Sequence, residues 1–101
     1  MAVKISLVTV CCNAAGTIRR TLESADAQRG VELEHIVVDG ASSDGTVDEL
    51  RAFRPAHSRF SFVSEPDQGL YDAINKGIAR ATGEVVGLLH ADDEFEDDSV
   101  L

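Results

Sequence analysis

The chain has 101 residues, of which 44% are hydrophobic and 27% are charged, with 18 acidic against nine basic side chains. This composition is typical of one soluble globular unit, because disordered chains contain fewer apolar residues. The formal net charge of −9 argues against nucleic-acid binding, which needs clustered Lys and Arg to neutralise phosphates. Six of the acids lie within residues 92–98, so the acidity is local.

Neither a membrane span nor a disulfide framework is expected. No stretch approaches the roughly 20 apolar residues that cross a bilayer, and the apolar run at residues 3–12 lacks the cleavage site of a secretory leader. The only cysteines, Cys11 and Cys12, are neighbours, which excludes a CxxC pair. Adjacent cysteines at the end of an apolar run are typical of core or strand-edge positions. We expect a cytoplasmic protein, with the inner face of the membrane as an alternative for a longer form.

Apolar runs rich in β-branched residues alternate with stretches of helical periodicity. The runs are typical of strands buried on both faces of a parallel sheet, and the periodic stretches repeat apolar residues every three or four positions. In chain order, the expected elements are a strand at Lys4–Val10, a helix at Ala15–Ala27, a strand at Leu33–Asp39, a helix at Gly45–Phe53, a strand at Phe60–Ser64, a helix at Leu70–Ala81 and a strand at Glu84–Leu89.

Particular residues indicate where these helices begin, how closely they pack and which histidines have no assigned role. Asp44 is placed to cap the second helix at its N-terminus. Gly77 lies inside the third helix, where glycine is unfavourable, so we expect it to permit close packing. His35 alternates outward on its strand and His57 follows a helix, so we assign neither a role.

Strands that alternate with helices over short connections predict an α/β fold: a Rossmann-like, three-layer arrangement with a mostly parallel sheet. In such sheets ligands bind beyond the carboxyl ends of the strands, where the strand order reverses. A strand order of 3-2-1-4 would place residues 11–13 opposite residues 90–93, with Asp39 alongside. Because the last residues have the pattern of a helix that has just begun, we expect residues 1–101 to be one domain from a longer protein.

The turn after the first strand, CCNAAG, contains neither GxGxxG nor GxxxxGK[ST]. A dinucleotide-dependent dehydrogenase and a P-loop nucleotidase are therefore disfavoured. Asp92 and Asp93 follow the last strand, and such carboxylates suit Mg²⁺ or Mn²⁺, which can bridge a protein to a diphosphate. The alternative is a solvated acidic loop that precedes a helix. Asp97 and Asp98 are assigned only to the dipole of a following helix.

Two predicted sites keep more than one interpretation. Asp39 ends a strand, where a carboxylate can accept a nucleobase N–H or a ribose hydroxyl, but Asp-Gly is also ordinary turn chemistry. His90 is either a ribose or metal contact or simply a polar strand end.

Three segments together resemble a known family. They are ISLVTVCCNA, HIVVDGASSDGT and EPDQGLYDAINKGIARATGEVVGLLHADD, and a helix with the pattern TLESADAQ follows the first. They are similar to the N-terminal half of family 2 glycosyltransferases, which have the GT-A fold, across residues 3–95. The segment DQGLYDAINKGIARATG most resembles bacterial members that build cell-surface polysaccharides.

The resemblance implies transfer of a sugar from a nucleotide-diphospho-sugar to a saccharide or lipid-linked acceptor, with inversion and a divalent cation (Mg²⁺ or Mn²⁺). His90-Ala91-Asp92 occupies the D-x-D motif of the family, with Asp92 as the metal ligand, and the adjacent Asp93 is predicted to belong to the same metal site. Asp39 corresponds to the carboxylate that recognises the base. The nucleotide-binding residues implied are Thr9, Cys11, Cys12, Asn13, Asp39, Asn75, Lys76 and His90.

The chain departs from the family pattern at two positions. His90 replaces the first Asp of D-x-D, and Cys12 stands where many members place an aromatic residue against the base. The general base of the family comes from a segment beyond Leu101, so we expect these 101 residues to bind the donor weakly and not to transfer sugar. The alternatives are a non-catalytic nucleotide- or metal-binding module and, less favoured, a phosphotransfer domain with Asp39 as acceptor.

Overall fold

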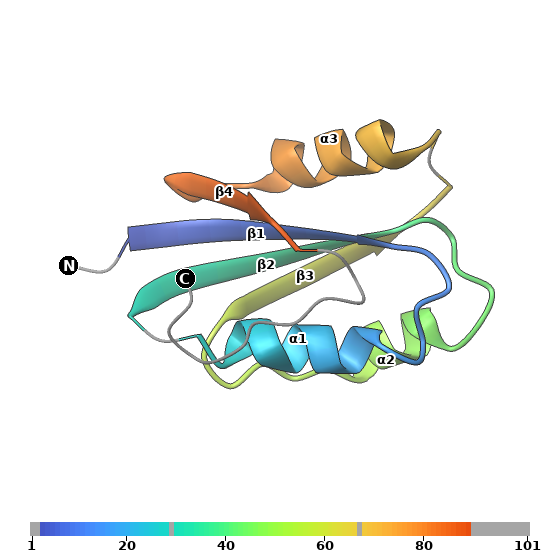
Figure 1. The fold of residues 1–101 in the computed structure, drawn as a ribbon, viewed down its shortest axis with the longest axis horizontal. Helices are drawn as coiled ribbons and strands as arrows, with labels where there is room; N and C mark the ends of the chain where they lie inside the picture. The colour runs from blue at the N-terminus through green and yellow to red at the C-terminus, as the bar shows by residue number, and fades with distance from the viewer. Residues whose placement is uncertain (1–2, 29, 67, 90–101) are drawn as a thin grey trace.

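The computed structural model describes residues 3–28, 30–66 and 68–89, in which strands and helices alternate (Figure 1). The elements are β1 (Val3–Cys11), α1 (Ile18–Asp26), β2 (Val31–Asp39), α2 (Thr46–Ala52), β3 (Arg59–Ser64), α3 (Leu70–Arg80) and β4 (Val85–Leu88). The predicted alternation is confirmed. Among the described residues, no helix is both long enough and apolar enough to cross a membrane.

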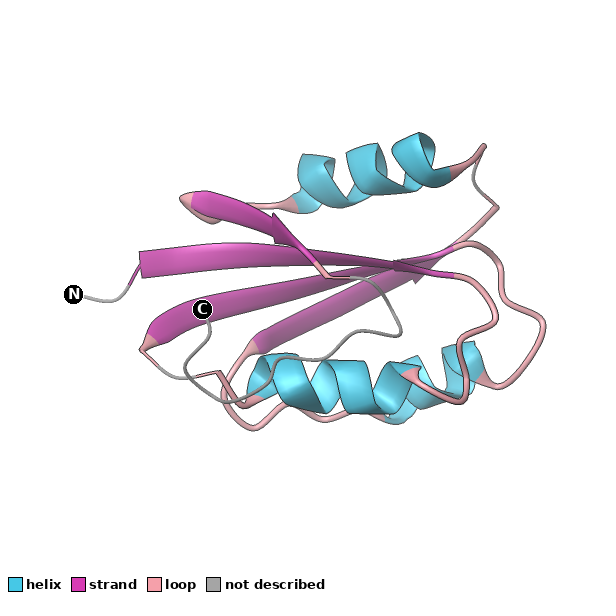
Figure 2. Cartoon of the chain, viewed as in Figure 1, coloured by secondary structure: helices cyan, strands magenta, loops and turns pink. Residues whose placement is uncertain are grey.

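All four strands are parallel, in the order β3-β2-β1-β4. β1 pairs with β2 over its full length, from Val3 opposite Val31 to Cys11 opposite Asp39. Helices α1 and α2 lie against one face of the sheet and α3 lies against the other (Figure 2). The three-layer arrangement is the one that the sequence predicts. The strand order is the one under which residues 11–13 and Asp39 were expected to meet, and it brings the carboxyl ends of β1, β2 and β3 to one edge.

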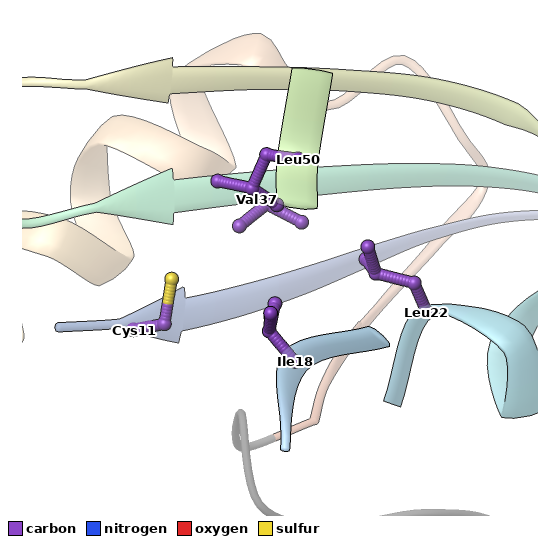
Figure 3. Close-up of a cluster of buried hydrophobic side chains, with 5 residues drawn as sticks. All are labelled: Cys11, Ile18, Leu22, Val37 and Leu50. Atoms are coloured by element: carbon purple, nitrogen blue, oxygen red, sulfur yellow. The ribbon is translucent and has the colours of Figure 1, made fainter. Parts of the chain in front are cut away.

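The main hydrophobic core lies between the sheet and helices α1 and α2. Alternate residues of β1 and β2 point to this face, and helix residues three or four positions apart pack against them. The buried members are Cys11, Ile18, Leu22, Val37 and Leu50 (Figure 3). Phe53, Phe60 and Phe62 pack around them, with neighbouring ring centroids 5.1 and 6.1 Å apart.

Helix α1 begins three residues later than the sequence predicts. The residues before it form a turn, in which the N–H groups of Thr17 and Ile18 both donate to the carbonyl of Ala14. The helical periodicity of the sequence extends into this turn, because a turn and a first helical turn place side chains similarly.

His35 is buried, although the alternation of its strand predicts an outward side chain. Only 1% of it is exposed, its Nε2 lies 2.8 Å from the hydroxyl of Thr9, and its ring meets Phe60 edge-on. The expectation is wrong because the sheet is covered on both faces, so neither face of β2 points to solvent. Burial lowers the pKa of His35 to about 4, and the nearby Asp26 opposes this only in part.

Asp26 fastens the end of α1 to the segment that leads into β3. Its carboxylate accepts hydrogen bonds from the N–H groups of Ala56, His57 and Ser58 and from the Ser58 hydroxyl, at 2.6–3.1 Å. Burial opposes the negative charge, but these hydrogen bonds outweigh it and lower the pKa of Asp26. Because residues 56–58 precede β3, this contact lies at the amino edge of the sheet.

Helix α3 approaches β1 closely because Gly77 has no side chain. A Cβ atom at this position would lie 2.3 Å from Cγ1 of Val8, so the prediction that Gly77 permits close packing is confirmed. Ala73 is also buried on this face, whereas Leu70 is 52% and Ile78 47% exposed. Only part of the apolar stripe of α3 therefore packs on the sheet.

Gly77→Ala should lower the free energy of unfolding, measured in urea, by about 1–3 kcal/mol, because the new methyl group must displace the buried Val8. The better helix propensity of Ala, about 1 kcal/mol, offsets part of this loss. Val8→Ala should cost less in the Gly77→Ala background than in the wild-type protein. Gly16→Ala is the control, because a Cβ there meets nothing within 4 Å. Equal costs of Val8→Ala in both backgrounds would contradict the close contact.

The free energy of unfolding should fall by about 3 kcal/mol as the pH is lowered from the ordinary His pKa of 6.5 to about 4. In this window the unfolded chain binds a proton at His35 that the folded protein does not. Asp26 and Asp39, whose pKa values are lowered, also stabilise the folded protein. Their contribution is lost mainly below their ordinary pKa of 3.8, at a lower pH than that of His35.

Urea unfolding at several pH values, with His35→Gln as the comparison, tests this expectation. Glutamine can still meet the hydroxyl of Thr9 but does not titrate. A pH dependence between 4 and 6.5 that is the same in the variant would contradict the role of His35.

Candidate functional site

The loops that follow β1 and β2 are tied together at the carboxyl edge of the sheet. The N–H of Gly40 donates to the carbonyl of Cys11 at 2.9 Å. The N–H of Asn13 donates to the Ser42 hydroxyl at 2.7 Å, and the N–H of Ser43 donates to the side-chain oxygen of Asn13 at 2.8 Å. The two loops therefore form one surface.

The start of α2 belongs to the same network. The N–H of Ala14 donates to the hydroxyl of Thr46 at 2.8 Å, and the N–H of Ala15 donates to Asp44 Oδ2 at 3.2 Å. The sequence predicts Asp44 as the N-cap, but the structure places Gly45 there, with Asp44 one residue earlier. Asp44 still accepts the N–H of Thr46 at 2.9 Å, so it satisfies one of the free donors of the helix.

Cys12 and Asn13 form the exposed side of the first loop. Asn13 has a φ of 53°, in the left-handed region that asparagine tolerates better than most residues. The thiol of Cys12 points to the carbonyl of Gly40, with sulfur and oxygen 3.6 Å apart. Both predicted contact residues are thus accessible to a ligand at this edge.

Asp39 lies at the centre of this edge, with none of its surface exposed. Its carboxylate accepts hydrogen bonds from the N–H and hydroxyl of Ser42 at 2.9 and 2.5 Å, from the Ser64 hydroxyl at 2.7 Å and from the Cys11 thiol at 3.3 Å. Burial opposes the charge, but these bonds outweigh it and lower the pKa of Asp39. A carboxylate offers about four acceptor positions, so a ligand N–H reaches it only by replacing one of these donors.

Cys11 is a buried core residue whose thiol donates a hydrogen bond to Asp39. Burial, followed by the hydrogen bond to Asp39, raises the pKa of the thiol well above its ordinary range. A thiol that stays protonated is not a nucleophile. The expectation of a core or strand-edge position is confirmed for Cys11, and its contact with a nucleotide stays a prediction.

The remaining predicted contacts lie further from this surface. The Thr9 side chain is fully buried and bonded to His35, so a nucleoside contact there stays a prediction. Asn75 is exposed on α3, across the sheet from α1. The ammonium of Lys76, on the same helix, contacts Pro66 and two carboxylates, and its contact with a diphosphate also stays a prediction.

His90, Asp92 and Asp93 lie outside the described residues. The described chain ends at Leu89, whose N–H donates to the carbonyl of Val8 at 3.0 Å, so it reaches residue 89 beside β1. Within residues 3–28, 30–66 and 68–89, no three His, Cys, Asp or Glu side chains are grouped to hold a metal ion. The cation site at Asp92 and Asp93 stays a prediction.

Ser42 and Ser64 belong to the site, although the sequence pattern singled out neither. Ser42 follows a strand-ending aspartate by three residues, a spacing in which an Asx side chain binds its own turn, so a local signal existed. Ser64 has no local signal. It meets Asp39 because the register of β2 and β3 places the two residues opposite each other.

A cavity of about 430 Å³ lies elsewhere, between α1, α2 and the segment that follows α2. Its lining includes Arg19, Phe53 and His57, and it shares no residue with the predicted site.

This chain is similar to a family of glycosyltransferases and to individual members of it. The model of glycosyl transferase family 2 matches residues 6–101. An uncharacterized glycosyltransferase of Mycobacterium tuberculosis is 40% identical over 98 residues, which are 96% of this chain and 37% of the relative. The poly-beta-1,6-N-acetyl-D-glucosamine synthase of Staphylococcus epidermidis is 35% identical over 96 residues, 94% of this chain and 23% of the relative. The chain thus spans well under half the length of these relatives.

Solved structures share the fold. The mannosyltransferase PcManGT from Pyrobaculum calidifontis, in complex with GDP-Man and Mn²⁺, has a TM-score of 0.88 and 28% identity over 97% of this chain and 30% of that one. S. aureus TarS 1-349, in complex with UDP-GlcNAc, has a TM-score of 0.77 and 26% identity over 90% of this chain and 27% of that one. The expected GT-A type of α/β fold is confirmed, and the chain belongs to glycosyl transferase family 2.

Proposed function

We propose that this chain provides the donor-binding part of a glycosyltransferase, which moves a sugar from a nucleotide-diphospho-sugar to an acceptor hydroxyl with inversion. The observation that carries this function is the buried, charged Asp39 at the carboxyl edge of a family 2 fold. The nucleotide sugars held by PcManGT and TarS support a donor of this class. The synthase among the relatives supports a role in polysaccharide synthesis. We propose that the polysaccharide is a cell-surface one and that the acceptor is a saccharide or is lipid-linked.

The nucleobase is proposed to bind Asp39 by taking the place of the Ser42 hydroxyl. That hydroxyl is one of two donors to Oδ1 and lies next to the exposed loop of Cys12 and Asn13. A base N–H in its place would keep the number of hydrogen bonds to the buried carboxylate unchanged. The exchange therefore leaves no buried charge unsatisfied, which would otherwise be costly.

Asp92 and Asp93 are the residues proposed to hold a divalent cation, with His90 beside them. The net charge of −9 supports this assignment, because an acidic protein needs a counter-charge to bind a diphosphate. When bound, Mg²⁺ or Mn²⁺ would stabilise the charge that develops on the departing diphosphate. We propose that the general base and the acceptor site lie in sequence beyond residue 101.

The first prediction concerns the cation. UDP or GDP should bind measurably in calorimetry with MnCl₂ and more than tenfold more weakly with EDTA, since a charge-assisted contact is worth about 1.5–3 kcal/mol. Asp92→Asn should remove the effect of Mn²⁺, whereas Asp98→Asn, which we assign no metal role, should leave it unchanged. Binding that is equally tight with EDTA, or unaffected by Asp92→Asn, would contradict the assignment.

The second prediction concerns Asp39. Asp39→Asn should weaken the binding of the preferred nucleotide about 10- to 100-fold, because it removes a charge-assisted hydrogen bond worth about 1.5–3 kcal/mol. It should also lower stability, because the amide leaves the N–H of Ser42 without its charged acceptor.

Asp26→Asn is the matched control for this loss of stability. Asp26 is a buried carboxylate that also holds a loop, but at the amino edge of the sheet. It should destabilise the protein while leaving nucleotide affinity unchanged. Equal losses of affinity in both variants would show that Asp39 acts through stability alone.

A further inference from the structure

The ammonium group of Lys76, in the middle of α3, is fully engaged by three oxygens. It lies 3.0 Å from the carbonyl of Pro66, 3.2 Å from Glu65 Oε1 and 3.3 Å from Asp72 Oδ2. An ammonium has three N–H donors, so each has an acceptor. Burial opposes the positive charge, but the contacts to Glu65 and Asp72 outweigh it and raise the pKa of Lys76, so the group stays charged.

Two of these acceptors belong to the segment that joins β3 to α3, and the third holds the same segment. Asp72 Oδ2, which contacts Lys76, also accepts the N–H of Gln68 at 2.9 Å. Lys76 and Asp72 together therefore hold Glu65, Pro66 and Gln68 against one side of α3. Gly69 lets the chain enter the helix there, with a φ of 114° that other residues rarely adopt.

The same segment contacts the centre of the carboxyl edge. The N–H of Glu65 donates to the backbone carbonyl of Asp39 at 3.0 Å, and the Ser64 hydroxyl donates to its carboxylate at 2.7 Å. A single residue, Glu65, thus connects the ammonium of Lys76 to Asp39. These two contacts of Glu65 therefore link helix α3 to the carboxyl edge of the sheet at Asp39.

We propose that Lys76 is a positioning residue for the nucleoside part of the donor, and that it acts through Glu65 rather than by touching the diphosphate. This role rests on the proposed function, because it needs a nucleoside at Asp39. Its physical cause is that Lys76 fixes where Glu65 leaves β3, and Glu65 and Ser64 in turn set the position of Asp39.

A direct contact with the diphosphate makes opposite predictions. An ammonium that binds phosphate oxygens would contribute to the affinity of UDP but not of uridine, which has no phosphate. Removal of Glu65 would then free Lys76 and tighten UDP binding or leave it unchanged. A positioning role instead predicts weaker binding of the nucleoside itself, and weaker binding when Glu65 is removed.

The experiment measures the dissociation constants of UDP, GDP, uridine and guanosine in the presence of MnCl₂. Lys76→Met should weaken the binding of the preferred nucleoside and of its diphosphate by a similar factor, about fivefold. A loss of this size corresponds to the energy of one surface ion pair. Lys76→Arg should recover most of the loss. Glu65→Ala should weaken both, and the double variant should be no weaker than Lys76→Met, because the two residues act as one unit.

Arg80→Met is the charge control, because Arg80 is an exposed basic residue in the last turn of the same helix. It removes the same charge without the contacts of Lys76, so the affinity for the nucleoside should not change. Amide hydrogen exchange gives a second readout: Lys76→Met should speed exchange at Glu65 and Gln68 without changing the slowest amides of β1 and β2.

The possible outcomes distinguish failure of the positioning role of Lys76 from failure of the proposed function. Lys76→Met that weakens only the diphosphates, or Glu65→Ala that tightens them, would overturn the positioning role while nucleotide binding by the wild-type protein still supports the proposed function. Unchanged affinity and unchanged exchange in Lys76→Met would overturn it as well. A wild-type protein that binds none of the four compounds would overturn both the proposed function and the positioning role.

Discussion

The buried charge of Asp39 is the constraint on which the carboxyl edge of this fold depends. A carboxylate without exposed surface is costly unless it is fully hydrogen-bonded, and Asp39 obtains its four donors from three different chain segments. Cys11 comes from β1, Ser42 from the loop after β2, and Ser64 from β3. The need to satisfy one charge therefore fixes the relative positions of three strand ends, and this is the rigid surface that a nucleoside site requires.

Much of the fold could be predicted because strand burial and helix periodicity leave direct marks in the sequence. The elements and the parallel sheet follow from β-branched runs and short connections, whereas the rules for crossovers only narrow the possible strand orders and the structure selects one of them. Three features escaped local reasoning. The turn before Ile18 continues the helical pattern, the polar His35 is buried because neither face of the sheet is open to solvent, and Leu70 and Ile78 lie on an apolar stripe wider than the face that packs.

The site could be predicted in part for a similar reason. Residues at strand ends converge wherever parallel strands pair, so the sequence could place the end of β1 near Asp39, although the exact pairing of Cys11 with Asp39 comes from the register. The contacts of Ser64 depend on the register between strands, and those of Lys76 depend on the approach of a helix to a loop far from it in sequence. Neither leaves a local pattern. The Asp92 site stays a prediction from sequence.

The most direct measurement is a crystal structure of the protein with MnCl₂ and the nucleotide, UDP or GDP, that binds it more tightly. A base N–H should lie within hydrogen-bond distance of the Asp39 carboxylate, the Ser42 hydroxyl should have left that position, and the cation should lie on Asp92. A structure in which the bond between Ser42 and Asp39 is intact, with the base bound elsewhere, would contradict the central claim that this buried charge recognises the donor.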